Sequence, residues 1–155
     1  MSEYSPASHS APLTVETRLE SLLRLGRATP AFLQGVFPFA GRGIYDVGPL
    51  DDSLTYVVPD GKTMQIQYVR AGNHSDDLLY LVLTADGRPI RYFPVGPKGD
   101  FHVALAIVET HPGGTRIEIA YAAPRGLTGA IVVDIGLVEL DVELVAPETG
   151  AEERS

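Results

Sequence analysis

Residues 56–83 read YVVPDGKTMQIQYVRAGNHSDDLLYLVL, and they contain two different strand patterns. Between Met64 and Tyr68, apolar residues alternate with glutamines, as expected of a strand with one face in solvent. Residues 78–83 are apolar on both faces, which predicts a central strand. Turn-forming residues lie between the two runs. Together these patterns predict antiparallel β structure.

The tripeptide Gly61-Lys62-Thr63 matches the last three residues of the nucleotide-binding P-loop motif, so a phosphate site has to be considered. That motif needs a glycine five residues before the Gly-Lys pair, and Tyr56 occupies this position. It also needs a helix after the lysine, whereas a strand pattern follows here. Asp60-Gly61 is instead typical of a two-residue hairpin turn. We therefore interpret the tripeptide as a turn and predict a hairpin around it.

The chain from residue 54 to residue 145 keeps the two-residue period, and helical spacing does not return. Asp86-Gly87 predicts a second hairpin turn, and alternating runs follow at residues 101–109 and 116–122. About eight strands separated by turn residues are typical of an antiparallel sandwich. The predicted fold class is therefore mainly β, an antiparallel and jelly-roll-like β-sandwich of about eight strands.

The last apolar run, AIVVDIGLVELDVEL, changes phase near its middle. Its apolar residues share one parity from Ile131 to Leu137 and the other parity from Val138 to Leu144. One regular strand would turn each set to a different face of the sheet. A bulge or bend near Gly136 is predicted to resolve this conflict, by letting the chain change face or change sheet.

Residues 13–53 combine one N-terminal helix with a Pro/Gly-rich apolar segment. Helical spacing extends over residues 14–28, with Thr14 as the predicted N-cap and Gly26 as the stop. The next segment, up to residue 50, is expected to be an irregular arm on its own domain or on a neighbouring subunit, because Pro and Gly disfavour regular pairing. The candidate interface residues in this arm are Phe32, Leu33, Val36, Phe37 and Phe39.

Composition limits the classes of partner. The net charge of −8 and the pI of about 4.8 disfavour a nucleic-acid surface. The absence of cysteine excludes disulfides, thiol catalysis and Cys-ligated zinc. Residues 1–12 lack a signal-peptide pattern, and no apolar run has the length of a bilayer span. We expect a cytoplasmic protein with no nucleic-acid or membrane partner. Residues 1–12 and the acidic residues 146–155 are expected to be disordered tails.

Few residues carry a signal for chemistry. The cluster from Asn73 to Asp77 offers oxygen ligands that suit calcium, but the same residues are typical of an Asx turn, which we favour. His74, His102 and His111 lack the spacing of metal ligands. No nucleophile elbow is present. We therefore predict no catalytic residue, no metal site and no cofactor.

Several aromatic and basic residues on the predicted strands could line a ligand pocket. The alternative is ordinary cross-strand pairing on an exposed face. The candidate pocket residues are Tyr68, Tyr80, Arg91, Tyr92 and His102.

Residues 58–77, VPDGKTMQIQYVRAGNHSDD, carry a V-P-x-G-K turn, an apolar strand and then Asn-x-Ser-Asp. This segment resembles the start of β-sandwich modules in phage virion and tail proteins. The resemblance implies a role in assembly or interaction, and it transfers no functional residue.

Two functional hypotheses follow. The first is a non-catalytic β-sandwich subunit for protein–protein assembly, either a homo-oligomer or an accessory subunit of a complex. The second is a small cofactor-free enzyme or a ligand-binding sandwich for a sugar or another small molecule. The apolar arm separates them, because docking on another chain favours assembly and closing a polar cavity favours ligand binding.

Overall fold

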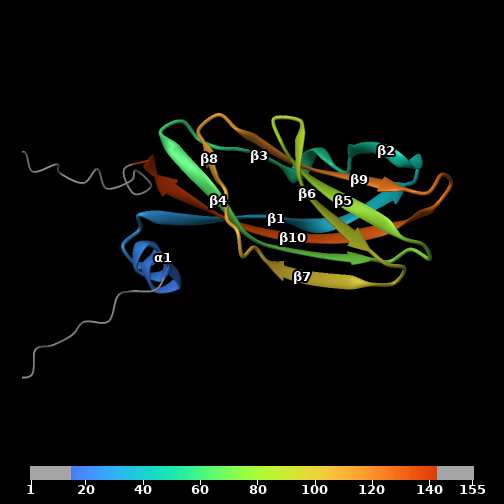
Figure 1. The fold of residues 1–155 in the computed structure, drawn as a ribbon, viewed down its shortest axis with the longest axis horizontal. Coiled ribbons are helices and arrows are strands. Elements are labelled where there is room, and N and C mark those ends of the chain that lie inside the picture. Colours follow the sequence, from blue (N-terminus) through green and yellow to red (C-terminus); the bar gives the residue numbers. More distant parts are fainter. Residues whose placement is uncertain (1–14, 143–155) are drawn as a thin grey trace, which may run out of the picture.

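The computed structural model describes residues 15–142. Within them the chain forms two antiparallel β-sheets, one α-helix and a short 3-10 turn, η1 (Asp52–Leu54) (Figure 1). The predicted mainly β class with one N-terminal helix is therefore confirmed. The predicted disordered tails at residues 1–12 and 146–155 and the predicted N-cap at Thr14 lie outside the described residues.

The first sheet has the strand order β1-β10-β4-β7, and β8 also pairs with β4. The second sheet has the order β2-β9-β5-β6, and β3 also pairs with β9. The strands of the first sheet are β1 (Ala28–Ala40), β4 (Lys62–Asn73), β7 (Asp100–Ala104), β8 (Thr110–Pro112) and β10 (Thr128–Asp141). Those of the second sheet are β2 (Gly43–Pro49), β3 (Thr55–Val57), β5 (Leu79–Ala85), β6 (Arg88–Val95) and β9 (Arg116–Ala123).

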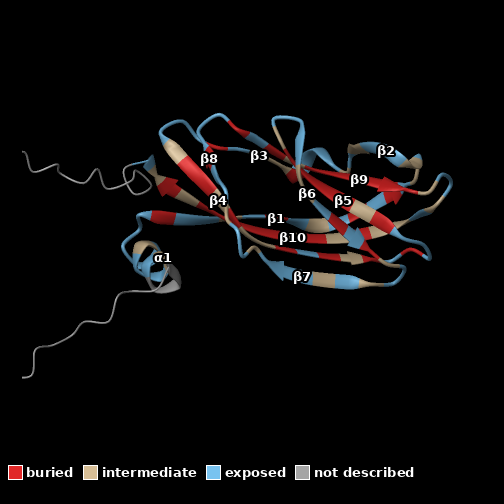
Figure 2. Cartoon of the chain, viewed as in Figure 1, coloured by how far each residue is buried: buried red, intermediate tan, exposed pale blue. Residues whose placement is uncertain are grey.

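The inward side chains of both sheets form one core. Ile66 of β4, Leu81 of β5 and Ile135 of β10 are nearly inaccessible to solvent. Figure 2 shows that buried residues follow the central strands, whereas β2 and β7 are mostly exposed. β5 lies between β6 and β9, and Val82 on its outer face is also buried. The central strand predicted from residues 78–83 is therefore confirmed.

The two predicted hairpin turns have different outcomes. Asp86 and Gly87 both have positive φ angles and join β5 to its neighbour β6, as predicted. Gly61 also has a positive φ, of 75°, and the N–H of Lys62 donates to the carbonyl oxygen of Pro59, so the predicted turn exists. The predicted hairpin is wrong, because β3 pairs in one sheet and β4 in the other. A turn reverses the direction of the chain locally, but it does not determine the strand with which each flanking segment pairs.

The segment predicted to be an irregular arm is mostly strand β1. Every residue from Ala28 to Ala40 is in antiparallel register with β10, so the expectation that Pro and Gly prevent regular pairing is wrong. Pro30 and Pro38 have the same parity, and β1 is the edge strand of its sheet. The missing N–H groups of both prolines therefore face the open edge, where no ladder bond is lost.

The phase change in the last apolar run is explained by α1 (Val15–Arg24). Val138 and Leu140 lie on the outer face of β10, where Leu19 and Leu22 of α1 pack against them. The register shifts opposite Gly136, as predicted, but the extra residue is in β4 and β10 keeps its parity against β1. The prediction that the chain changes face or sheet there is therefore wrong, because a helix covers the second apolar face.

Gly26 ends α1, as the sequence indicates. Its φ is 68°, its N–H donates to the carbonyl oxygen of Leu23, and the N–H of Arg27 donates to that of Leu22. This pair of bonds is the Schellman motif, which favours glycine at the left-handed position. Among the described residues, no helix has the length and apolar character needed to span a membrane.

Candidate functional site

A groove of about 530 Å³ runs over the outer face of the first sheet, across β10, β4 and β7. The register places Val132, Gly72 and Asp100 side by side on these three strands. Because Gly72 has no side chain, the row is lowest at its centre, and a Cβ there would lie 3.9 Å from the Cβ atoms of both neighbours. The floor of the groove is thus built by a single glycine on a central strand.

One wall of the groove is formed by Arg70 and Asp134, and Tyr68 outside the groove bonds to the same carboxylate. Arg70 of β4 donates through Nε and Nη2 to Oδ2 of Asp134, at 3.2 and 2.5 Å. The hydroxyl of Tyr68 donates to Oδ1 of the same carboxylate at 3.2 Å. Burial, followed by the charge of Asp134, raises the pKa of Tyr68 above its ordinary value. Both carboxylate oxygens of Asp134 therefore accept hydrogen bonds, and the raised pKa keeps the proton on the Tyr68 hydroxyl.

The opposite wall comes from the loop between β6 and β7. Nζ of Lys98 lies 3.3 Å from Oδ1 of Asp76 and donates to the carbonyl oxygen of His74 at 2.8 Å. Through these two contacts, the ammonium group of Lys98 connects the β6–β7 loop to the segment that crosses from β4 to β5. Each cation of the groove, Arg70 or Lys98, therefore faces a carboxylate, and the groove has no excess of positive charge that would select an anion.

Two polar groups on β7 are free to contact a ligand. Asp100 and His102 have the same parity and both line the groove. Neither side chain makes a hydrogen bond or an ion pair with another described residue, although the His102 ring meets the edge of Tyr68 at 5.6 Å. A carboxylate and an imidazole two residues apart can accept and donate hydrogen bonds to one small polar molecule.

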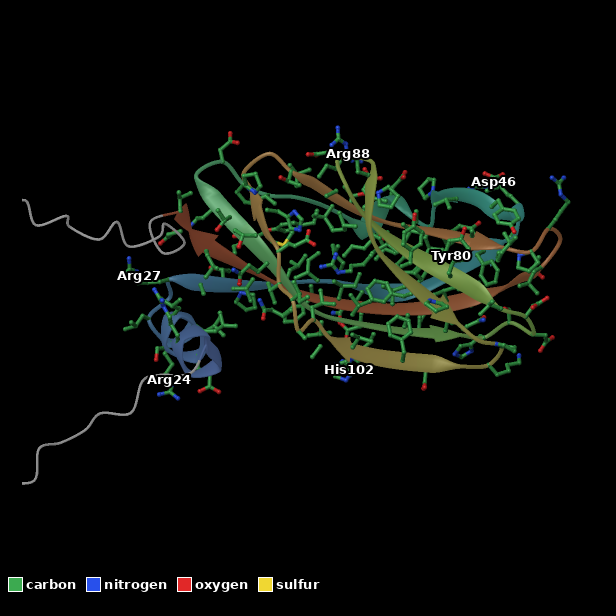
Figure 3. The ribbon with its side chains drawn as sticks, viewed as in Figure 1. Arg24, Arg27, Asp46, Tyr80, Arg88 and His102 are labelled. Carbon is green, nitrogen blue, oxygen red and sulfur yellow. The ribbon has the colours of Figure 1, made fainter. Side chains whose placement is uncertain are left out.

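The five predicted pocket residues do not meet in one pocket. Tyr68 and His102 are neighbours on the first sheet. Tyr80 and Tyr92 are neighbours on the outer face of the second sheet, with their ring centroids 6.1 Å apart. Figure 3 shows His102 and Tyr80 on β7 and β5, which belong to different sheets. Strands that follow one another in the chain often cross between the layers, which separates residues that are close in sequence.

Arg91, the remaining predicted pocket residue, lies at the margin of the core. Its guanidinium forms an ion pair with Glu109 at 2.7 Å. The neighbouring cavity, which His111 also lines, has a volume of only about 10 Å³. This space is too small to hold a ligand.

The predicted interface residues divide between the two faces of β1. Leu33, Phe37 and Phe39 point inward and belong to the chain's own core. Within the folded chain these three side chains cannot contact a partner, so they are core residues and not interface residues. Phe32 and Val36 have the opposite parity, with exposed fractions of 54% and 66%. The alternation explains the split, because a paired strand sends successive side chains to opposite faces.

The Asn73–Asp77 cluster forms an Asx turn. Oδ1 of Asn73 accepts from the N–H and the hydroxyl of Ser75, at 2.8 and 2.6 Å. Its Nδ2 donates to the carbonyl oxygens of Asp77, Val95 and Gly96. These bonds use the side-chain oxygen of Asn73, while Oδ1 of Asp76 lies beside Lys98 and Oδ1 of Asp77 accepts from the N–H of Leu78. Within residues 15–142, no group of three or more His, Asp or Glu side chains is placed to hold a metal ion.

Sequence reasoning missed the residues that build the groove, above all Gly72, Asp100 and Asp134. One signal was available, because Asp134 is the only charged residue between Ala130 and Val138. A lone acid in an apolar strand indicates a cross-strand partner, here Arg70. The chain matches no protein-family model, and no curated protein is significantly similar to it.

Proposed function

We propose that this chain is a non-catalytic subunit that assembles through protein–protein contacts, with itself or as an accessory subunit of a complex. The observation that supports this function best is the open edge of β1. The strand is 13 residues long and has no charged residue from Ala28 to Ala40. Natural proteins protect such edges with charges, bulges or covering segments, because an open edge pairs readily with another strand.

The side chains next to that edge add to the argument. Phe32 and Val36 project from the outer face of β1 and are more than half exposed. Between them Gln34 is exposed and uncharged. An apolar and uncharged surface beside unpaired backbone groups fits a protein partner better than it fits solvent.

The strand order supports a jelly-roll form of the sandwich as part of this proposal. The pairs are nested along the chain: β1 with β10, β2 and β3 with β9, β4 with β7 and β8, and β5 with β6. Counting β2 with β3, and β7 with β8, as interrupted single strands gives eight. A long hairpin folded over on itself in this way is the topology of a jelly roll.

Two further expectations belong to the same proposal. The resemblance of residues 58–77 to modules of phage virion and tail proteins fits an assembly role, and it rests on those residues alone. A cytoplasmic location is supported by the absence of cysteine from a chain of 155 residues.

Light scattering on the full chain tests the assembly function. We expect a mass above that of one 16.6-kDa chain at micromolar concentration. Replacing both exposed residues, in the variant Phe32→Lys/Val36→Lys, places positive charges beside the edge and should abolish the oligomer. Tyr45→Lys is the matched control, because Tyr45 on β2 is 95% exposed and lies in the other sheet. Equal loss in both variants, or a monomer throughout with no partner recovered from the source, would count against the proposal.

The second candidate function is binding of a small neutral or zwitterionic molecule in the groove. The specific observation in its favour is a volume of about 530 Å³ beside the free polar groups of Asp100 and His102. Ligand sites commonly have volumes of roughly 300–1,000 Å³. A thermal-shift screen with sugars and amino acids tests it. A stabilising compound should lose its effect in Asp100→Asn or His102→Gln and keep it in Tyr45→Lys, because Tyr45 on β2 lies in the other sheet and outside the groove.

A further inference from the structure

The open edge of β1 has a defined set of free backbone groups. At the end of the strand, the N–H and the carbonyl oxygen of Gly41 both bond to the residues that lead into β10. The carbonyl oxygen of Ala40 points the other way and accepts from the hydroxyl of Tyr121. Because the N–H and C=O of one residue lie on the same side of a strand, odd residues bond to β10 and even residues face the open edge.

Proline limits how much of this edge can pair. Among the even residues, Pro30 and Pro38 have no N–H to donate. The residues between them, Phe32, Gln34 and Val36, each keep a donor and an acceptor at the edge. No described strand pairs with this side of β1. Residues 32–36 therefore provide three edge-facing residues that can pair. Pro30 and Pro38 lie at equal distances from Gln34 on its two sides.

This spacing is self-complementary. A two-fold axis at Gln34 turns Phe32 onto the position of Val36, and Pro30 onto that of Pro38. An antiparallel pair of β1 strands centred there matches all three free donors with acceptors of the second copy, and it brings the prolines together where pairing has to end. Any shift of register would place a proline opposite a free residue and lose a hydrogen bond.

We propose that two copies of the chain pair antiparallel through β1, with Gln34 opposite Gln34 of the second copy, so that the first sheet continues across the dimer. This inference rests on the proposed function, of which it specifies the partner and the register. Phe32 packs against Val36 of the second copy on the outer face, an aromatic and β-branched cross-strand pair. The charge pattern also selects this edge, because each copy carries a net charge of −8 and β1 itself has none.

Single cysteines test the register, since the native chain has no cysteine to interfere. Directly opposed residues whose edges are hydrogen-bonded have Cα atoms about 5.5 Å apart, which a disulfide can bridge. Under mild oxidation, Gln34→Cys should therefore form a covalent dimer. Phe32→Cys alone should not, because the two copies of residue 32 would lie about 14 Å apart along the strands. The same holds for Val36→Cys alone, whereas a mixture of these two variants should form the mixed covalent dimer.

Tyr45→Cys, with its exposed side chain on β2, reports the background of random collisions. The mass of each unoxidised variant by light scattering separates the inference from the proposed function. An oligomer in which Gln34→Cys crosslinks no better than Tyr45→Cys would overturn the register and leave the assembly function standing. A monomer would overturn the inference, and a monomer for which no partner is recovered from the source would overturn the proposed function as well.

Discussion

Asn73 joins two connections that cross between the sheets. Its exposed fraction is 1%, and its side chain bonds to the crossover after β4 and to the start of the loop after β6. Both donors and the acceptor of the amide are used, and no other side chain of this size offers the same combination. The sequence did indicate the Asx turn from the spacing of Asn73 and Ser75. It could not indicate the bonds to Val95 and Gly96, because these arise only when the sheets have packed.

Asn73→Ala should therefore destabilise the fold strongly. The substitution leaves the carbonyl oxygens of Val95 and Gly96 without their side-chain donor in a region closed to water, and one such unsatisfied group costs about 1–3 kcal/mol. We expect the free energy of unfolding in urea to fall by at least about 2 kcal/mol. Asp77→Ala is the control, because the Asp77 side chain is exposed and accepts only from the N–H of Leu78, so its effect should stay within about 0.5 kcal/mol.

His111 gives the fold a dependence on pH. Burial lowers the pKa of its imidazole, an effect that the charge of Glu109 partly opposes and that of Arg91 reinforces. The unfolded chain therefore binds a proton at this residue at higher pH than the folded chain does. Stability is complete above the unfolded pKa of about 6.5 and is lost as the pH falls toward the folded pKa.

Lowering the pH from 7 to 5 should reduce the melting temperature of the native chain by more than that of His111→Gln. One proton contributes at most about 1.4 kcal/mol per pH unit. Parallel melting curves for the native chain and His111→Gln would mean that another group is responsible.

The elements show where sequence patterns work and where they do not. The alternation from Met64 to Tyr68 and the apolar residues 78–83 predicted β4 and β5, because side-chain period follows directly from burial. β1 was not predicted as a paired strand, because Pro and Gly disfavour strands in general. That preference ignores which side of the strand each proline N–H would face. The equal parity of Pro30 and Pro38 was the missed sign of an edge strand. The groove was not predicted at all, because its walls come from three strands and a loop whose order in the sheet only the fold defines.

A substitution that weakens the contact of helix α1 should release the helix while the first sheet stays folded. The helix packs through Leu19 and Leu22 on a small cluster made of Ala28 in β1 and of Val138 and Leu140 in β10, which is separate from the main core. In Leu22→Ala this contact is reduced, so trypsin should cleave faster after Arg24 and Arg27, which lie at the end of α1 and in the link to β1 (Figure 3). The more exposed Leu23 lies outside the cluster, and Leu23→Ala should leave the cleavage rate unchanged. Equal rates for both variants would show that α1 is held in another way.

For the whole molecule, the described residues form a two-sheet body in which β1 is a long edge strand without a charged residue. The sequence predicted an apolar surface between residues 30 and 50, and the structure divides it into core residues and a narrow exposed row on β1. Each copy carries a net charge of −8, so two copies repel each other on average, and an uncharged contact surface adds no repulsion of its own. An uncharged edge strand is therefore the surface at which association costs least.

Sedimentation equilibrium on the full chain, Gln34→Pro and Gln34→Ala tests whether two copies assemble through the edge of β1. The N–H of Gln34 faces away from β10, and prolines already occupy positions of the same parity, so Gln34→Pro should fold normally while losing the central donor of the edge. We expect twice the 16.6-kDa mass for the native chain and for Gln34→Ala, and the mass of a single chain for Gln34→Pro. A Gln34→Pro chain that keeps the native dimer would show that the edge of β1 is not the assembly surface.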